Sequence, residues 1–156
     1  MRALPWIALA LIAMTGVGLA TNGAINAAAD DKPKVPDMAG EWTGTSESVV
    51  LGSGGHHPGG GTLQDKPRLR EVAFALSVAG QEGRRFWGTI KSPDFSEPFA
   101  AIFSTSNVYA YGADPDGFYH LKSLGPDQLE LCYTQPATSP TGSIVAACTV
   151  FTRVKP

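Results

Sequence analysis

The stretch REVAFALSV, at residues 70–78, decides the fold class of this chain. Every second side chain is large and apolar, and this set is Val72, Phe74, Leu76 and Val78. Alternation with a period of two indicates a β-strand with one face buried in a core. The next residues, AGQEG at 79–83, are typical of a turn, and RRFWGTIK at 84–91 predicts the strand that returns beside the first.

The same alternation and the same turn residues recur along the rest of the chain. Strands are predicted at residues 40–51, 70–78, 84–91, 99–104, 108–113, 118–124, 129–134 and 143–153. Most connections are short, and DPDG at 114–117 is the clearest turn. Eight consecutive strands predict an all-β fold, a single eight-stranded antiparallel up-and-down barrel, which leaves no exposed sheet edge. A two-sheet sandwich is the alternative architecture.

The start of the chain has the order of a secretory signal peptide. Arg2 supplies a positive charge, residues 6–19 form an uncharged and mostly apolar run, and small residues follow. Cleavage is expected after Ala29, with Ala20 as the alternative site. The sequence therefore predicts three segments, which are a signal peptide at 1–29, an extended leader at 30–39 and a β-barrel domain at 40–156. The expected location is periplasmic or secreted.

Composition argues against several classes of partner. The formal net charge is −2 and acidic residues dilute the basic ones, so neither nucleic acid nor an anionic membrane surface is indicated. The apolar run at 6–19 is shorter than the roughly 20 residues that a spanning helix needs. No membrane insertion is therefore expected after cleavage. These features indicate a small exported domain with one modest core.

The two cysteines, Cys132 and Cys148, are expected to form a disulfide. In an oxidising compartment two lone cysteines most often pair, and the bridge would stabilise a small domain. Leu131 and Tyr133 lie on one face of their predicted strand, so Cys132 lies on the other. The same parity places Cys148 opposite the apolar face of the last strand. The bridge should therefore join the last two strands from the outer side of the barrel.

Gly40-Glu41-Trp42 opens the first predicted strand, and Arg153 lies on the inward face of the last one. This arrangement resembles the G-x-W opening of the calycin barrels, which include the lipocalins, the fatty-acid-binding proteins and the avidins. In those families the tryptophan closes the bottom of the barrel, and a basic residue of the last strand packs across its ring. The resemblance implies that Trp42 and Arg153 form this closure here, with the cation over the face of the indole.

A second resemblance concerns the segment in front of the barrel. MAGEW at residues 38–42 is similar to the A-G-x-W opening of bacterial periplasmic inhibitors of secreted zinc metalloproteases. Those inhibitors are also small eight-stranded barrels with one disulfide, and the segment before their barrel enters the protease cleft. The resemblance implies an alternative function, which is inhibition of an exported protease through the leader at residues 30–37.

GSGGHHPGGG, at residues 52–61, contains two adjacent histidines and so raises the question of a metal site. A structural zinc site needs four ligands and a catalytic one usually needs three, whereas this loop offers only His56 and His57. Ordering so many glycines around a metal would also cost conformational entropy. A solvated surface loop is therefore expected here, with no metal and no cofactor.

Catalysis finds little support in the sequence. No nucleophile elbow, phosphate-binding loop or zinc-protease motif is present. His120 is the candidate general base, and it shares a strand face with Phe118 and Lys122, as an ordinary strand histidine does. We therefore predict that the chain is not an enzyme, and keep an enzyme that uses His120 as an alternative.

Aromatic side chains recur in most of the predicted strands and give the most useful signal for function. They fill the core of a small barrel, and a pocket that remains among them would suit a small apolar or aromatic ligand. The candidate ligand-binding residues are Phe74, Phe86, Phe99, Phe103, Tyr109 and Tyr111. The leading prediction is an exported, non-catalytic binding protein whose partner is a small molecule at the mouth of the barrel.

Overall fold

The computed structural model describes residues 33–53, 57, 59, 61–139 and 142–155 of the 156-residue chain. The predicted signal peptide, at residues 1–29, therefore lies outside the described residues. Within the described part, every element of regular secondary structure is a β-strand. Among these residues there is no helix with the length and apolar character to cross a membrane.

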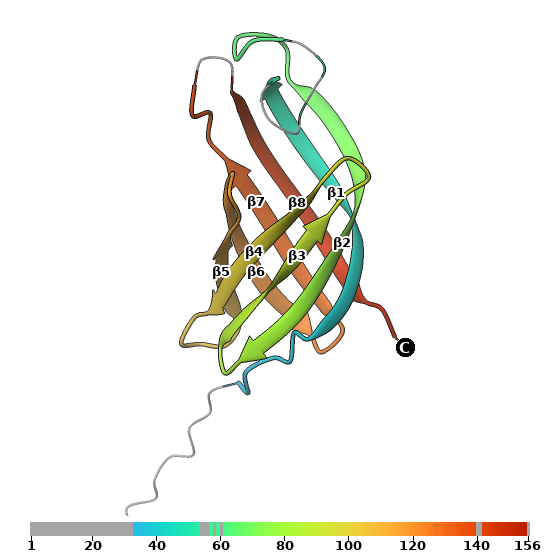
Figure 1. Cartoon of the computed structure of the whole chain (residues 1–156), viewed down its shortest axis with the longest axis vertical. Coiled ribbons are helices and arrows are strands. Elements are labelled where there is room, and N and C mark those ends of the chain that lie inside the picture. Colours follow the sequence, from blue (N-terminus) through green and yellow to red (C-terminus); the bar gives the residue numbers. More distant parts are fainter. Residues whose placement is uncertain (1–32, 54–56, 58, 60, 140–141, 156) are drawn as a thin grey trace, which may run out of the picture. The chain divides into compact units, whose positions relative to one another are not determined.

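The eight strands form one closed barrel (Figure 1). They are β1 (Gly40–Gly52), β2 (Arg68–Glu82), β3 (Arg85–Lys91), β4 (Ser96–Phe103), β5 (Tyr109–Ala113), β6 (Phe118–Gly125), β7 (Gln128–Gln135) and β8 (Ser143–Arg153). Each strand pairs antiparallel with its neighbour in the chain, and β8 pairs antiparallel with β1. The predicted all-β, eight-stranded up-and-down barrel is confirmed.

The alternation in β2 sets which side chains enter the barrel. Leu76 and Val78 are buried, while Glu71 on the opposite face is exposed. The strand is longer than the sequence predicts at both ends. Residues 68–78 pair with β1 and residues 75–82 pair with β3, and a bulge between Val78 and Gly80 bends the strand.

The core side chains fill the half of the barrel that contains the start of β1 and the end of β8. This half is the lower one in Figure 1. Phe86, Phe103 and Phe151 are each at most 2 % exposed. The ring centroids of Phe86 and Phe103 are 5.3 Å apart, and those of Phe86 and Phe99 are 6.2 Å apart with the rings edge to face. Such contacts stabilise aromatic pairs beyond the area that they bury, so this half serves as the core of the domain.

Trp42 and Arg153 meet at the lower end of the barrel. They are paired in the β1–β8 register, and the guanidinium carbon of Arg153 lies 4.1 Å from the centroid of the indole ring. Arg153 also donates to the carbonyl of Ala39 at 2.5 Å, and its Nε lies 3.4 Å from the carboxylate of Asp127. Trp42 Nε1 donates to the carbonyl of Met38 at 3.0 Å. The packing of the Arg153 guanidinium on the Trp42 ring holds the start of β1 against the end of β8.

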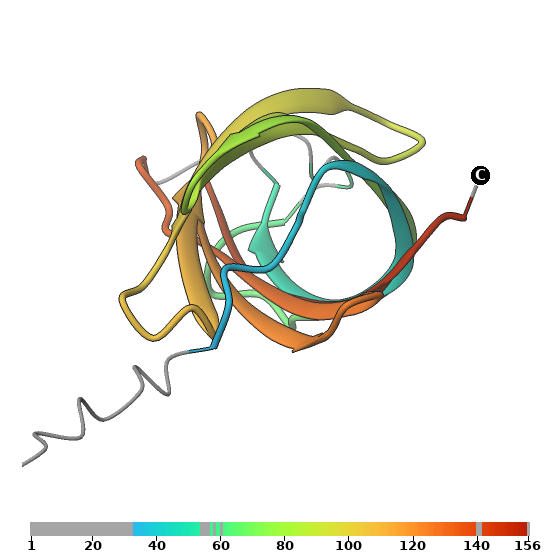
Figure 2. The same ribbon diagram turned by 90° about the horizontal axis from the view of Figure 1, so that it is seen from below.

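The described part of the leader, Pro33 to Ala39, crosses the lower opening of the barrel (Figure 2). Barrel side chains hold its backbone. Gln81 Nε2 donates to the carbonyl of Pro36 at 2.8 Å, and Asn107 Nδ2 donates to that of Pro33 at 2.7 Å. The side chain of Val35 packs against the core. The leader from Pro33 onward is therefore a strap on the barrel and not an arm that projects from it.

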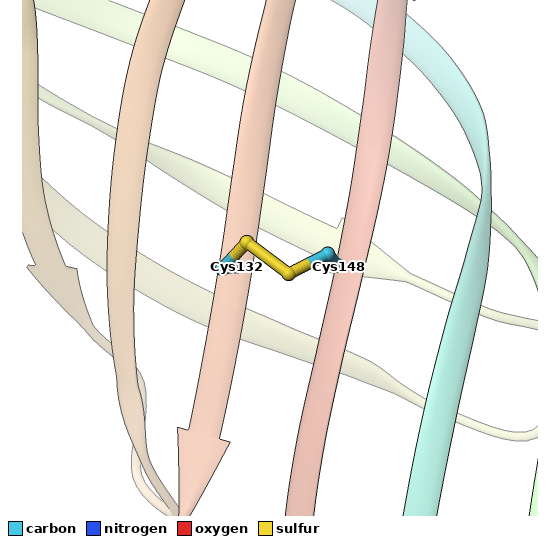
Figure 3. The surroundings of a disulfide bond; sticks show 2 residues. All are labelled: Cys132 and Cys148. Carbon is cyan, nitrogen blue, oxygen red and sulfur yellow. A yellow bond between two sulfur atoms is a disulfide. The ribbon is translucent and has the colours of Figure 1, made fainter.

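Cys132 and Cys148 form a disulfide between β7 and β8 (Figure 3). The two residues are directly opposite each other in the register of these strands. Leu131 on β7 and Thr149 on β8, their neighbours in the chain, are buried on the inner face. The bridge therefore lies on the outer face of the barrel. A disulfide is consistent with an oxidising, exported compartment.

Candidate functional site

A cavity occupies the half of the barrel at the end where the β1–β2, β3–β4, β5–β6 and β7–β8 connections lie. This is the upper end of the barrel in Figure 1. Its volume is about 70 Å³. The cavity therefore has room for more than a single water molecule. The barrel is thus closed and packed at one end and hollow at the other.

One wall of the cavity is acidic and phenolic. It is built by inward-facing residues of β4, β6 and β7 and by the turn between β5 and β6, and consists of Glu97, Asp114, Asp116, Tyr119 and Tyr133. The rings of Tyr119 and Tyr133 are 5.2 Å apart at their centroids. Tyr119 also meets the core ring of Phe99 edge to face, at 6.4 Å. The packed core therefore fixes the position of this wall.

Asp114 is held in place by its own turn. Its Oδ1 accepts hydrogen bonds from the backbone N–H groups of Asp116 at 2.9 Å and Gly117 at 2.7 Å, the pattern by which aspartate initiates a turn. Its Oδ2 accepts a hydrogen bond from the hydroxyl of Tyr119. The DPDG sequence that predicted a turn thus also points a carboxylate into the cavity.

Burial raises the pKa of Tyr119 and of Tyr133 above the value of a free phenol, and the carboxylate of Asp114 raises both pKa values further. In Tyr119 the second cause is the hydrogen bond from its hydroxyl to Asp114. A phenolate at either position would lose hydration and face a negative charge. Both hydroxyls are therefore hydrogen-bond donors throughout the neutral pH range.

These pKa values predict that the protein loses stability at alkaline pH. Both phenols ionise near pH 10 in the unfolded chain, but stay protonated to a higher pH in the folded state. Their contribution to the free energy of unfolding is complete below about pH 10 and is lost as the pH rises through the raised pKa values. Urea midpoints from about pH 8 to about pH 11 measure this loss. The loss should be smaller in a Tyr119→Phe/Tyr133→Phe variant, and an equally steep loss there would contradict the assignment.

The opposite wall of the cavity is apolar with a few hydroxyl groups. It comes from β1, β2 and β8 and includes Ser46, Val72, Phe74, Val145, Ala147 and Thr149. Phe74 packs edge to face on Phe95 at a centroid distance of 5.7 Å, which connects this wall to the β3–β4 turn. Arg70 also lines the cavity, and its guanidinium lies 3.8 Å from the carboxylate of Asp94. The cavity therefore has two chemically different sides.

The structure separates the six predicted ligand-binding residues into three groups. Phe74 lines the cavity. Phe86, Phe99 and Phe103 are buried in the packed lower core, where the barrel needs them for stability. The prediction that Tyr109 and Tyr111 line the interior is wrong, because both side chains lie on the outer face of β5, and Tyr111 is 57 % exposed. Ala110, between them, is the residue that faces inward.

Several cavity residues were not among the predicted site residues. They are Glu97, Asp114, Asp116, Tyr119, Tyr133 and Arg70. The signal for the tyrosines was present, since Tyr119 alternates with Leu121 and Tyr133 with Leu131 on inward faces. Glu97 gave no such signal, because the segment SPDFSEP reads as a break between strands, whereas β4 in fact begins at Ser96.

His120 lies on the outer face of β6, on the same face as Phe118 and Lys122, which the sequence predicts. Its ring stacks between those of Tyr109 and Tyr111, at centroid distances of 5.6 and 5.2 Å. The residue does not line the cavity described above. The structure thus places the candidate general base of the enzyme alternative away from the site.

The histidine pair of the glycine-rich loop is only partly described. His56 lies outside the described residues, whereas His57 lies at the edge of the cavity. Arg68 donates to the carbonyl of His57 at 3.1 Å and thereby ties this point of the loop to β2. Within the described part of the chain, no three His, Cys, Asp or Glu side chains are grouped as a metal site requires.

Comparison with known proteins adds little to this description. No family model and no curated protein matches the chain. Among solved structures, the chain is similar to the S-type phycobiliprotein lyase CPES from Guillardia theta, with 10% sequence identity and a TM-score of 0.34. The match covers 76% of this chain and 89% of that one. A likeness this slight carries no argument about the site.

Proposed function

We propose that this chain is an exported, non-catalytic, calycin-like binding protein that takes a small apolar or aromatic ligand into the cavity at the upper end of its barrel. The observation that carries the proposal is the contrast between the two ends of the barrel. Trp42, Arg153 and the leader strap close the lower end, while a cavity of about 70 Å³ remains at the upper end. An eight-stranded barrel is the size at which the interior either packs completely or holds one small ligand.

The lining supports binding rather than chemistry. Apolar side chains such as Val72, Phe74 and Val145 offer contact area to a hydrocarbon body. The hydroxyl groups of Tyr119 and Ser46 offer hydrogen bonds that fix its orientation. The small volume favours a small ligand, or one end of a larger molecule that extends through the loops.

Export is part of the proposal. The outer-face disulfide between Cys132 and Cys148 supports it, because such bonds persist in oxidising compartments. The signal-peptide pattern at residues 1–29 supports it from the sequence. Inhibition of a protease through the leader receives no comparable support, since the backbone of Pro33 and Pro36 is bonded to the barrel.

A pair of substitutions on one strand tests the cavity. Ala147 lines the cavity, whereas its neighbour Ala146 points outward and is exposed. Ala147→Phe should fill the space and raise the Kd for a small neutral aromatic such as benzyl alcohol by at least about tenfold. Ala146→Phe should leave the Kd within about twofold, because it adds the same group outside. Titration followed by ¹H–¹⁵N NMR measures both constants.

The same titration can contradict the proposal in two ways. If Ala147→Phe binds benzyl alcohol as well as the parent does, the ligand sits elsewhere on the protein. If the parent protein shows no saturable shifts with benzyl alcohol, phenol or toluene, the cavity does not bind small aromatic molecules. Urea denaturation of the two variants shows whether each remains folded, so a loss of binding is not confused with a loss of structure.

A further inference from the structure

We infer that the outer face of strands β3 to β6 is the surface through which two copies of this chain associate, about a two-fold axis. The inference starts from the large apolar side chains that this face exposes. Trp87, Ile102, Tyr111 and Phe118 are each between 43 % and 62 % exposed. Single exposed apolar residues are ordinary, but a contiguous group of them marks an interaction surface. None of the four lines the ligand cavity, so the inference is independent of the proposed function.

The strand register shows that the exposed side chains are contiguous. They belong to two neighbouring rows that run across the four strands, with paired residues side by side. The first row consists of Trp87, Ala100, Ala113 and Phe118. The second row consists of Arg85, Ile102, Tyr111 and His120. On each strand the two rows are two residues apart, so all of these side chains point to the outer face of the barrel.

The composition of the two rows is that of an interface core. Aromatic residues and arginine are enriched at the cores of protein interfaces, whereas lysine, glutamate and aspartate are depleted. Neither row contains an acidic residue or a lysine. Arg85 lies 3.2 Å from Glu82 in an exposed ion pair, and because such a pair contributes little to stability, the guanidinium can turn to a partner.

The pattern of large and small side chains in the two rows is self-complementary. A two-fold axis that runs across the strands, between the rows, places the first row of one copy on the second row of the other. Ile102 then faces Ala100 of the second copy, and Tyr111 faces Ala113 of the second copy. Each large side chain thus meets a small one, as close packing requires. An axis along the strands would instead set Ala100 against Ala113 and leave a void at the centre.

The ends of the rows carry long side chains, where the curvature of the barrel separates the two copies. About the same axis, Arg85 faces Trp87 of the second copy, and His120 faces Phe118 of the second copy. The ring of Trp87 covers Gly80 with one face and is half-exposed, so its other face is open to a partner. A guanidinium over the face of an indole is a favourable pair. The two-fold axis forms this pair twice.

Face-to-face contact with a second copy fits this surface in kind and in size. The barrel is closed and offers no free sheet edge to an added strand, so association must use the face. Aromatic side chains each present about 150–250 Å², so three that are half-exposed offer roughly 300 Å². A stable interface buries about 800 Å² on each partner. The aromatic residues supply less than half of this area and the rest comes from the rim, so the dimer should dissociate on dilution.

Sedimentation velocity over a range of protein concentrations tests the inference. We expect a reversible equilibrium between monomer and dimer that saturates at the dimer. Ala100→Arg puts a bulky charge against Ile102 of the second copy and should raise the Kd of the dimer at least about tenfold. Tyr111→Ser removes a large side chain from the same contact and should act in the same direction. The matched control, Ala73→Arg, adds the same group to the exposed outer face of β2 and should stay within about twofold of the parent.

A mixing experiment tests how the two copies are aligned. When an Ala100→Arg chain pairs with an Ile102→Glu chain, the two-fold axis brings the new guanidinium beside the new carboxylate and leaves the other central contacts as in the parent. The mixture should therefore associate at least about tenfold more tightly than the Ala100→Arg chain alone. The Ala100→Arg chain mixed with the parent lacks the carboxylate, so this control mixture should associate more weakly than the first one.

Each outcome decides the inference. A monomer at every concentration overturns it, and so does association that continues beyond the dimer. An equal effect of Ala73→Arg would assign the loss to added charge rather than to this face, and mixing without a gain would show that the two rows do not meet. Either result also overturns the inference. Urea denaturation shows that each variant remains folded, and none of these outcomes bears on the ligand cavity.

Discussion

Replacing Trp42 by alanine is expected to lower the free energy of unfolding by about 3–5 kcal/mol. Trp42 is 1 % exposed and closes the lower end of the barrel. Its removal leaves a void that the surrounding strands can fill only in part, because the barrel fixes their positions. Arg153 loses the ring face beneath its guanidinium, and the carbonyl of Met38 loses the indole N–H. The losses act on the same end of the barrel and add to the cost of the void.

Trp87→Ala provides the matched control, since it deletes the same side chain from the outer face. Trp87 is 47 % exposed, and its ring covers Gly80, where an added Cβ would lie 2.5 Å from the ring. We expect this substitution to cost less than about 1 kcal/mol. Urea denaturation followed by far-UV circular dichroism compares the two variants with the parent. If the two variants lose the same free energy of unfolding, or if Trp42→Ala loses less than about 1 kcal/mol, the contact between Trp42 and Arg153 does not stabilise the barrel.

The contrast between Trp42 and Trp87 illustrates how far the sequence determines the fold. Alternation with a period of two predicts the inward face of β2, and the same period accounts for the outward position of Trp87 between the buried Phe86 and the half-buried Gly88. It also gave all eight strands in order, because the turn residues between them are strong signals. Strand ends were less predictable. β4 begins earlier than its apolar residues indicate, because pairing with β3 extends to Ser96.

The interior of the barrel was harder to predict, and β5 shows why. The sequence YAY at residues 109–111 offers either two tyrosines or one alanine to the core, and burying the larger side chains is the default expectation. The interior at this level is already occupied, because Phe99 and Phe103 of β4 are buried there. Space is so limited that a Cβ on Gly112 would lie 2.9 Å from the Cβ of Ala101. Packing against the neighbouring strand therefore places Ala110 inside the barrel and the two tyrosines outside, which is the reverse of what side-chain size favours.

The acidic side of the cavity could not be predicted from the sequence, for a different reason. Carboxylates in turns are normally solvated, and Asp114 has an adequate explanation in turn chemistry alone. Only the closure of the barrel shows that this turn brings Asp114 beside Tyr119, and that Glu97 of β4 lines the same space. The aromatic content predicted a site in the barrel interior, but which residues line it depends on contacts between segments far apart in the chain.

Removing the disulfide is expected to lower the free energy of unfolding by about 3 kcal/mol. Cys132 and Cys148 are 16 residues apart in sequence, so the bridge closes a loop of moderate length in the unfolded chain. In the folded state the bridge adds little, because β7 and β8 are paired along their length on both sides of it. The stabilisation therefore comes mainly from the lower entropy of the unfolded chain in the loop-closure model.

Reduction and mutation give two independent measurements of this effect. The urea midpoint should fall when a reductant is added to the parent protein, and Cys132→Ser/Cys148→Ser should match the reduced parent without responding to reductant itself. For a domain whose net stability is about 5–15 kcal/mol, a loss of this size is a large fraction of the total. Binding of benzyl alcohol to the folded variant should stay unchanged, because neither cysteine lines the upper cavity. An unchanged midpoint after complete reduction, verified by alkylation of both thiols, would show that the paired strands alone fix the last hairpin.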